Sequence, residues 1–226
     1  MKISYRLAII IAVYVTCLIT ANITAVKMIT LGPLTFFAAI FVFPLSYIVG
    51  DVLTEVYGYR MARRVIWLGF ICNLILVFFV WIVQLLPSAK AWTGQEAYKT
   101  ILGSTPRILV ASFLGYLAGE FSNSFVLSKM KILTKGRWLW TRTIGSTVIG
   151  EGLDTVVFSS LATLGTPFFM PGLMLNQWVG KTLIEAIFTP VTYIIVNWLK
   201  RSEGVDTYDY KAKYNPFLIT DRGQAE

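Results

Sequence analysis

The sequence predicts an all-α membrane protein of six transmembrane helices with both termini in the cytoplasm. Three observations carry this prediction. The chain is 56% hydrophobic and only 14% charged, whereas soluble domains carry about 25% charged residues. Its apolar residues form runs of about 20, the length that a helix needs to cross a bilayer. Its basic residues gather in every second loop, as in proteins whose Lys and Arg hold loops in the cytoplasm.

The six predicted spans share an apolar length of about 20 residues or more. They lie at Tyr5–Val26, Leu34–Val56, Val65–Leu86, Ile108–Leu127, Trp140–Leu164 and Leu173–Leu199. Pro44 and Pro190 fall inside the second and sixth spans, where a proline removes a backbone donor and can break the helix. A membrane tolerates such a break where the freed backbone faces protein or a wet cavity. We therefore expect some of the helices to be broken.

The basic loops predict the orientation. One set comprises Lys2, Arg6, Arg60, Arg63, Arg64, Lys129, Lys131, Lys135, Arg137, Arg142, Lys200, Arg201, Lys211 and Lys213. The opposite side has Lys27, Lys90, Lys99 and Arg107. This bias places both termini inside. It divides the chain into a six-helix transporter domain, residues 1–201, and a cytoplasmic tail, residues 202–226, which we expect to lie against the bundle.

Composition also excludes several classes of protein. The net charge of +8 does not indicate nucleic-acid binding, because the basic residues sit at the ends of apolar segments. Histidine is absent, which removes the commonest metal ligand, and we expect neither a metal nor a cofactor. Cys17 and Cys72 lie in apolar spans and are expected to be small buried hydrophobes. An enzyme would have to work with carboxylates alone.

Six of the twelve acidic residues lie inside predicted spans: Asp51, Glu55, Glu120, Glu151, Asp154 and Glu185. An acidic group at the bilayer centre costs about 2.5–3.5 kcal/mol. Carboxylates in such positions mark a polar site or pathway by default. We therefore expect a cavity that binds a ligand rich in hydrogen-bond donors or positive charge.

A short theme recurs on four of the spans. A glycine directly precedes a charged residue, and another polar residue follows three or four positions later. These pairs are Asp51 with Glu55, Glu120 with Asn123, Glu151 with Asp154, and Lys181 with Glu185. Spacings of three and four place both groups on one helix face, and the glycine permits a close approach. Four helices therefore each present a polar pair toward the interior.

Two of these pairs also have a purely structural interpretation. Glu55 could pair with a nearby loop arginine, Arg60, Arg63 or Arg64, whereas Asp51 lies ~13 Å deeper than Arg60 along a helix. Lys181 could pair with Glu185 one turn away, or donate to a substrate.

Two further alternatives stay open at this point. Hydroxyls such as Ser146, Thr147 and Thr155 could satisfy Glu151 and Asp154 without any ligand. The GxxxG motif formed by Gly115 and Gly119 favours close helix packing, either within one chain or in a homodimer.

Three segments resemble the signature blocks of the queuosine precursor transporters, also called the vitamin uptake transporter family. They are FPLSYIVGDVLTEVYGYR (43–60), GEFSNSFVLSKMK (119–131) and RTIGSTVIGEGLDTVVF (142–158), and the ending YNPF (214–217) agrees with them. The resemblance extends over nearly the whole chain. It implies import of 7-cyano-7-deazaguanine and 7-aminomethyl-7-deazaguanine across a bacterial inner membrane, for queuosine salvage in tRNA.

The residues fit a ligand of this kind. A guanine-like edge carries adjacent ring N–H and amine donors, both of which one carboxylate can accept. Candidate donors to the ring oxygen are Lys181, Asn123 and Gln177; Phe43, Tyr47 and Trp178 could stack on the base, and Asn22 could line the cavity. Two alternative functions remain: a substrate-binding membrane subunit of an ATP-driven uptake system, and an intramembrane enzyme that depends on carboxylates.

Overall fold

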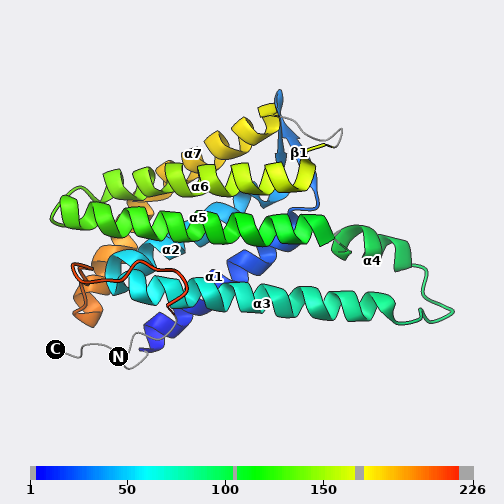
Figure 1. The fold of residues 1–226 in the computed structure, drawn as a ribbon, viewed down its shortest axis with the longest axis horizontal. Coiled ribbons are helices and arrows are strands. Elements are labelled where there is room, and N and C mark those ends of the chain that lie inside the picture. The colour runs from blue at the N-terminus through cyan, green and yellow to red at the C-terminus, as the bar shows by residue number, and fades with distance from the viewer. Residues whose placement is uncertain (1–3, 104–105, 166–170, 219–226) are drawn as a thin grey trace.

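A computed structural model describes residues 4–103, 106–165 and 171–218. Within these residues the chain forms seven α-helices, one short 3₁₀ helix and one two-stranded hairpin (Figure 1). In chain order the elements are α1 (Tyr5–Thr24), β1 (Met28–Leu31), β2 (Leu34–Phe37), η1 (Ala38–Phe41), α2 (Phe43–Tyr57), α3 (Tyr59–Leu85), α4 (Gln95–Leu102), α5 (Pro106–Leu133), α6 (Leu139–Thr163) and α7 (Pro171–Glu203).

The prediction of a helical membrane protein is confirmed. In the described part of the chain, α1, the continuous stretch Ala38–Tyr57, α3 and α7 are each long and apolar enough to cross a bilayer. The helices α5 and α6 have 28 and 25 residues, or ~42 and ~38 Å at about 1.5 Å per residue. These lengths also exceed the ~30 Å hydrocarbon core, but polar side chains lower their hydropathy.

Helix α2 lies at the centre of the bundle. Twelve of its fifteen residues are buried, and it contacts α1, α3, α5, α6 and α7. Large apolar side chains point outward instead, among them Phe79 and Trp81 of α3 and Ile187 and Ile194 of α7. A lipid-facing surface explains this distribution, because the apolar solvent lies outside the bundle and the polar groups gather within it.

The second predicted span is wrong in its first part. Residues from Leu34 to Phe37 form the second strand of an antiparallel hairpin, in which Met28 is paired with Phe37 and Leu31 with Leu34. The helix proper begins only at Phe43, so Pro44 occupies its first turn instead of interrupting it. A proline is tolerated there because the amide of that position has no partner within the helix.

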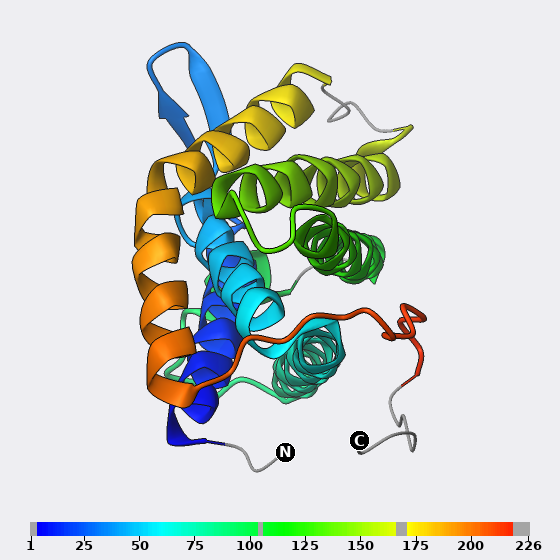
Figure 2. The same cartoon turned by 90° about the vertical axis from the view of Figure 1, so that its left-hand side faces the viewer.

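The predicted break at Pro190 is also wrong, because α7 runs continuously through this residue. Figure 2 shows α7 bending along its length. A proline ring clashes with the carbonyl of the preceding turn and bends a helix in this way.

Two segments cover opposite ends of the bundle (Figures 1 and 2). The β-hairpin lies at one end, where the Phe37 ring packs edge-on against Phe158 of α6 with centroids 6.3 Å apart. Phe36 and Ile40 lie so close to Gly180 of α7 that a larger residue there would meet both.

The other end is crossed by residues 204–218, which we call the C-terminal strap. Arg63 of α3 donates from Nη1 to the carbonyls of Lys213 at 2.9 Å and Asn215 at 2.8 Å. The Trp67 indole donates to the carbonyl of Pro216 at 2.8 Å. The strap thus lies against the bundle, as the sequence predicted for the tail.

Candidate functional site

Four helices bring five buried carboxyl groups into one region. We call this set, with Lys181, the mid-bundle cluster: Asp51, Glu120, Glu151, Asp154, Lys181 and Glu185. The exposed fractions of the five acids lie between 0 and 6%. The Tyr47 hydroxyl lies within electrostatic range of four of them, and Glu120 lies within range of Glu151, Asp154 and Glu185. The polar faces of the four helices therefore meet in one place.

Lys181 joins α7 to α6. Its ammonium donates to Glu151 Oε2 at 2.8 Å and to Asp154 Oδ2 at 2.9 Å. The expected helical pair of Lys181 with Glu185 is therefore not the contact that forms. The Phe43 ring faces the same ammonium, with 4.1 Å between Nζ and the ring centroid, which adds a cation–π attraction.

Asp51 and Glu185 form a second subgroup between α2 and α7. Asn123 Nδ2 of α5 donates to Asp51 Oδ1 at 2.7 Å, and the Thr147 hydroxyl of α6 donates to Glu185 Oε1. The two carboxyl groups are close neighbours. Each has one bonded oxygen, and the other oxygens, Asp51 Oδ2 and Glu185 Oε2, are buried without a hydrogen-bond partner in the part of the chain that the structure describes.

Glu120 differs from these acids because neither of its buried carboxylate oxygens makes a full hydrogen bond among the described residues, although the Tyr14 hydroxyl lies close enough to interact with it. The side chain lies between α5 and α2, where Oε2 would be 3.1 Å from a Cβ placed on Gly50. Buried polar atoms almost always have partners. Two buried acceptors without hydrogen bonds are typical of a site in which a ligand supplies the donors.

The glycines that precede the charged residues allow these helices to approach closely. A Cβ on Gly119 would collide with the Tyr47 hydroxyl, and would lie 2.8 Å from Asp154 Cβ and 3.0 Å from the Gly150 carbonyl. A Cβ on Gly150 would lie 2.7 Å from Asn123 Cβ. The GxxxG motif thus packs α5 against α6 within the chain, which is the use of small residues at close helix contacts.

The other predicted site residues fall into two groups, those with an unpaired polar atom and those bonded to other groups. Tyr47 and Gln177 are buried, and the Tyr47 hydroxyl and Gln177 Nε2 have no hydrogen-bond partner among the described residues. Trp178 instead donates its indole N–H to the Val148 carbonyl at 2.9 Å. Asn22 lies elsewhere, where it donates to Asn73 Oδ1 at 2.7 Å.

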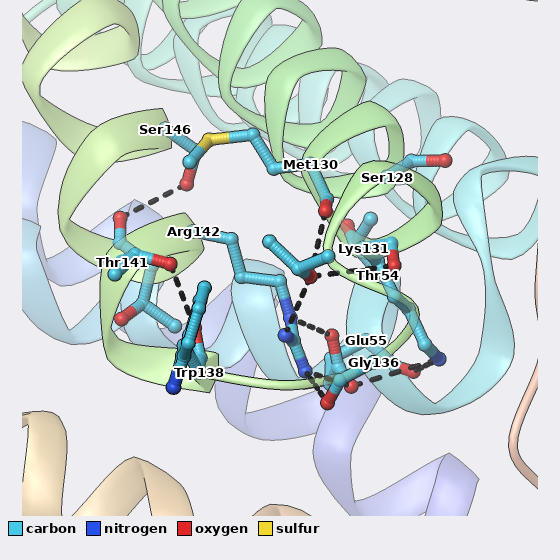
Figure 3. A network of polar contacts seen from close by, with 12 residues as sticks. Thr54, Glu55, Ser128, Met130, Lys131, Gly136, Trp138, Thr141, Arg142 and Ser146 are labelled. Carbon is cyan, nitrogen blue, oxygen red and sulfur yellow. Dashed lines mark hydrogen bonds and ion pairs between the residues drawn. The ribbon is translucent and has the colours of Figure 1, made fainter.

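Glu55 is separated from the mid-bundle cluster and belongs to a second network at the strap end (Figure 3). Arg142 holds it through two bonds, Nε to Oε2 at 2.8 Å and Nη2 to Oε1 at 2.9 Å. Lys200 Nζ lies 2.6 Å from Oε1, and Lys131 Nζ lies 3.6 Å from the same oxygen. These cations come from α5, α6 and α7, whereas the sequence suggested the arginines that follow the second span.

The strap adds one acid to this network. Asp206 Oδ1 accepts from Lys131 at 2.6 Å and from Lys200 at 2.9 Å. Partial burial alone would raise the pKa of this carboxyl, but the two ammonium groups hold it below its ordinary value. We call Glu55, Lys131, Arg142, Lys200 and Asp206 the strap-end network. In the sequence, only the basic residues near the helix ends pointed to this network.

The fold and these two networks define a polytopic helical membrane protein with an acid-lined interior, which is the plan of a carrier for a polar solute. The family described as "Putative vitamin uptake transporter" matches residues 37–195. The chain belongs to this family of transporters. Its acids are therefore to be read as parts of a transporter and not of an enzyme.

Three relatives carry a more specific name. A "Probable queuosine precursor transporter" of Bacillus subtilis is 34% identical over 74% of this chain and 72% of its own length. The "Queuosine precursor transporter" of Escherichia coli is 25% identical over 69% of this chain and 66% of its own length. A third relative, from Haemophilus influenzae, is 26% identical over 65% of this chain and 58% of its own length. No solved structure matches.

Proposed function

We propose that this protein imports queuosine precursors, 7-cyano-7-deazaguanine and 7-aminomethyl-7-deazaguanine, across a bacterial inner membrane. The names of the three relatives support the substrate class. Independent support comes from Glu120, whose two buried oxygens make no full hydrogen bond among the described residues. This is the observation that carries the proposal.

The chemistry of Glu120 suits the edge of a guanine-like base. The ring N–H and the exocyclic amine are adjacent donors, and the two oxygens of one carboxylate can accept both. Bonds in which the acceptor is ionised are shorter and about twice as strong as neutral ones. An adenine-like edge offers an acceptor at the ring nitrogen, so it would leave one oxygen of Glu120 unmatched.

The remaining groups complete the recognition. The Lys181 ammonium has three N–H donors, and Glu151 and Asp154 take two of them, which leaves one for the ring carbonyl. The Gln177 amide is a second candidate donor. Phe43 and Tyr47 have ring centroids 5.7 Å apart and offer an aromatic face beside the ammonium.

We further propose six spans, formed by α1, the Ala38–Tyr57 stretch, α3, α5, α6 and α7, with both termini in the cytoplasm. Figure 1 supports this, because the start of α1, the turn between α5 and α6, and the end of α7 all lie at one end of the bundle. The basic residues of these segments would then face the cytoplasm. A reporter that is active only outside the cytoplasm, fused after Glu226, should stay silent, and a signal from it would overturn this topology.

The test of the function is a binding titration with the purified protein. Both deazaguanine bases should bind saturably, guanine should bind more weakly or equally, and adenine should not compete. Purified protein in liposomes should then take up the base without ATP. Binding without such uptake would favour a membrane subunit that needs separate ATPase partners, and the absence of binding would overturn the proposal.

A further inference from the structure

The mid-bundle cluster contains more acid than its bases can neutralise. Five buried carboxyl groups face the single ammonium of Lys181 within this cluster. If every carboxyl were ionised, four negative charges would be uncompensated in a membrane interior. Uncompensated buried charges are so costly that such groups take up protons or bind cations. The mid-bundle cluster must therefore hold additional positive charge, and protons are its simplest source.

The geometry selects one pair of acids for this role. Glu151 and Asp154 already share the Lys181 ammonium, and Glu120 is the acceptor that the proposed function assigns to the base. Asp51 and Glu185 are 1% and 2% exposed and lie beside one another on different helices. Among the residues that the structure describes, no cation forms an ion pair with either of them, and Lys181 is paired with Glu151 and Asp154.

The described groups around this pair supply hydrogen-bond donors but no positive charge. From α5 come Asn123, which donates to Asp51, and Glu120, which adds a negative field. From α6 come Thr147, which donates to Glu185, and Glu151, whose charge also faces Glu185. From α2 itself Glu55 adds a further negative charge to Asp51. Two carboxyls in such a setting cannot both ionise, and one proton between them removes the repulsion.

We propose that Asp51 and Glu185 form a proton-binding site, and that one proton bound there crosses the membrane with each base. This inference rests on the proposed function and adds its energy source. The proton enters from the outer solution, forms one O–H bond on either carboxyl, and leaves to the cytoplasm after the base. While it is bound, α2 and α7 are held together. When it leaves, the two carboxylates repel and the contact between these helices loosens.

The experiment uses the purified protein in liposomes with labelled 7-aminomethyl- or 7-cyano-7-deazaguanine. An inward proton gradient should drive accumulation above the external concentration, and a protonophore should abolish it. Adding the base outside should raise the external pH as protons enter with it. Accumulation driven by a sodium gradient at equal pH, or uptake indifferent to both gradients, would overturn the inference.

Asp51→Asn and Glu185→Gln separate a coupling role from a merely structural one. In each variant we expect gradient-driven accumulation to fall at least tenfold, whereas exchange of internal for external base falls much less and loses its dependence on pH. Glu96→Gln on the exposed helix α4 is the matched control and should change neither measurement. Variants that keep pH-dependent accumulation would refute the assignment to this pair.

The binding titration distinguishes failure of the inference from failure of the proposed function. A protein that binds no deazaguanine base refutes the function itself. A protein that binds the base and equilibrates it, without any response to the proton gradient, refutes only the proton site. If a variant does not bind the base, proton uptake by the wild-type protein on addition of the base still decides the question.

Discussion

Glu55 and Glu120 are chemically identical, and both are completely buried, yet they have opposite surroundings. Glu55 accepts two hydrogen bonds from Arg142 and another from Lys200. Glu120 has no cation and no full hydrogen bond on either oxygen among the described residues, and only the Tyr14 hydroxyl lies nearby as a donor. Burial alone therefore does not distinguish the two carboxylates. The presence or absence of a partner does, because only the open acceptor has bonding capacity left for a ligand.

The two networks also differ in what holds the helices together. In the strap-end network both acids, Glu55 and Asp206, are paired with cations, and these ion pairs join α2, α5, α6, α7 and the strap. The mid-bundle cluster joins the same four helices through acids that exceed the available cations. A transporter needs a contact that can change with its cargo, and the unmatched cluster is the one whose energy a ligand or a proton would alter.

The largest expected loss of stability comes from a change in the strap-end network. Glu55→Gln would leave Arg142, Lys200 and Lys131 facing a neutral amide, and breaking a buried pair typically costs ~3–5 kcal/mol. We expect a clear fall in melting temperature of the purified protein and a loss of folded material in the membrane. Arg142→Gln should do the same from the other side. Unchanged melting in both variants would show that the pairing is not what holds this end together.

Glu120→Gln should have the opposite effect: it should weaken base binding without lowering the stability of the protein. The amide replaces one acceptor with a donor that faces a donor of the base, which costs ~1–3 kcal/mol, or roughly five- to a hundredfold in affinity at 1.4 kcal/mol per tenfold. Removing an unpartnered buried carboxyl should leave the melting temperature equal or higher. Base binding and thermal unfolding, measured on one preparation, check both expectations. Normal binding would assign Glu120 to structure and remove the contrast with Glu55.

The contents of the mid-bundle cluster could be predicted from the sequence, but its connections could not. Polar residues in apolar spans are conspicuous, and the spacing of three or four places each pair on one face. The partners depend on how the helices are ordered and rotated in the bundle. Arg142 lies 87 residues from Glu55, and Lys200 lies 145 residues from it. A local sequence pattern can suggest only nearby partners for Glu55, such as Arg60, Arg63 and Arg64, and could not have identified these distant cations.

The hairpin shows the corresponding limit for the fold. Residues 28–37 are almost as apolar as the helices beside them, and hydropathy alone does not separate a short apolar strand from a helical segment. Gly32, with a φ of 59°, and the proline after it mark the turn in retrospect. Reading them as a turn would have moved the start of the second helix to Phe43 and placed Pro44 at its beginning.

A smaller loss of stability is expected from a change at the contact between α5 and α6. Gly119→Ala would put a methyl group against the Tyr47 hydroxyl and 3.0 Å from the Gly150 carbonyl, and overpacking of this kind costs ~1–3 kcal/mol. We expect lower stability and weaker base binding together, because Tyr47 must shift. Gly172→Ala is the control, since none of the described residues lies within 4 Å of its Cβ position. Equal behaviour of the two variants would mean that the helices can separate freely.

The smallest expected effect is on the outer edge of the strap-end network. The pKa of Asp206 is lowered in the folded protein, so its contribution is complete above the ordinary pKa of about 3.9 and is lost as the pH falls through the lower, folded value. Its side chain is 42% exposed, so solvent screens the pairs, and exposed pairs contribute only ~0.2–1 kcal/mol. Asp206→Asn should therefore speed hydrogen exchange of residues 204–218 only a few-fold near neutral pH. The difference from the wild-type protein should begin to shrink as the pH falls below about 4 and should vanish only below the lowered pKa of the folded protein, once intrinsic exchange rates are corrected for. A variant as damaging as Glu55→Gln would show that the strap, and not the buried glutamate, is the centre of this network.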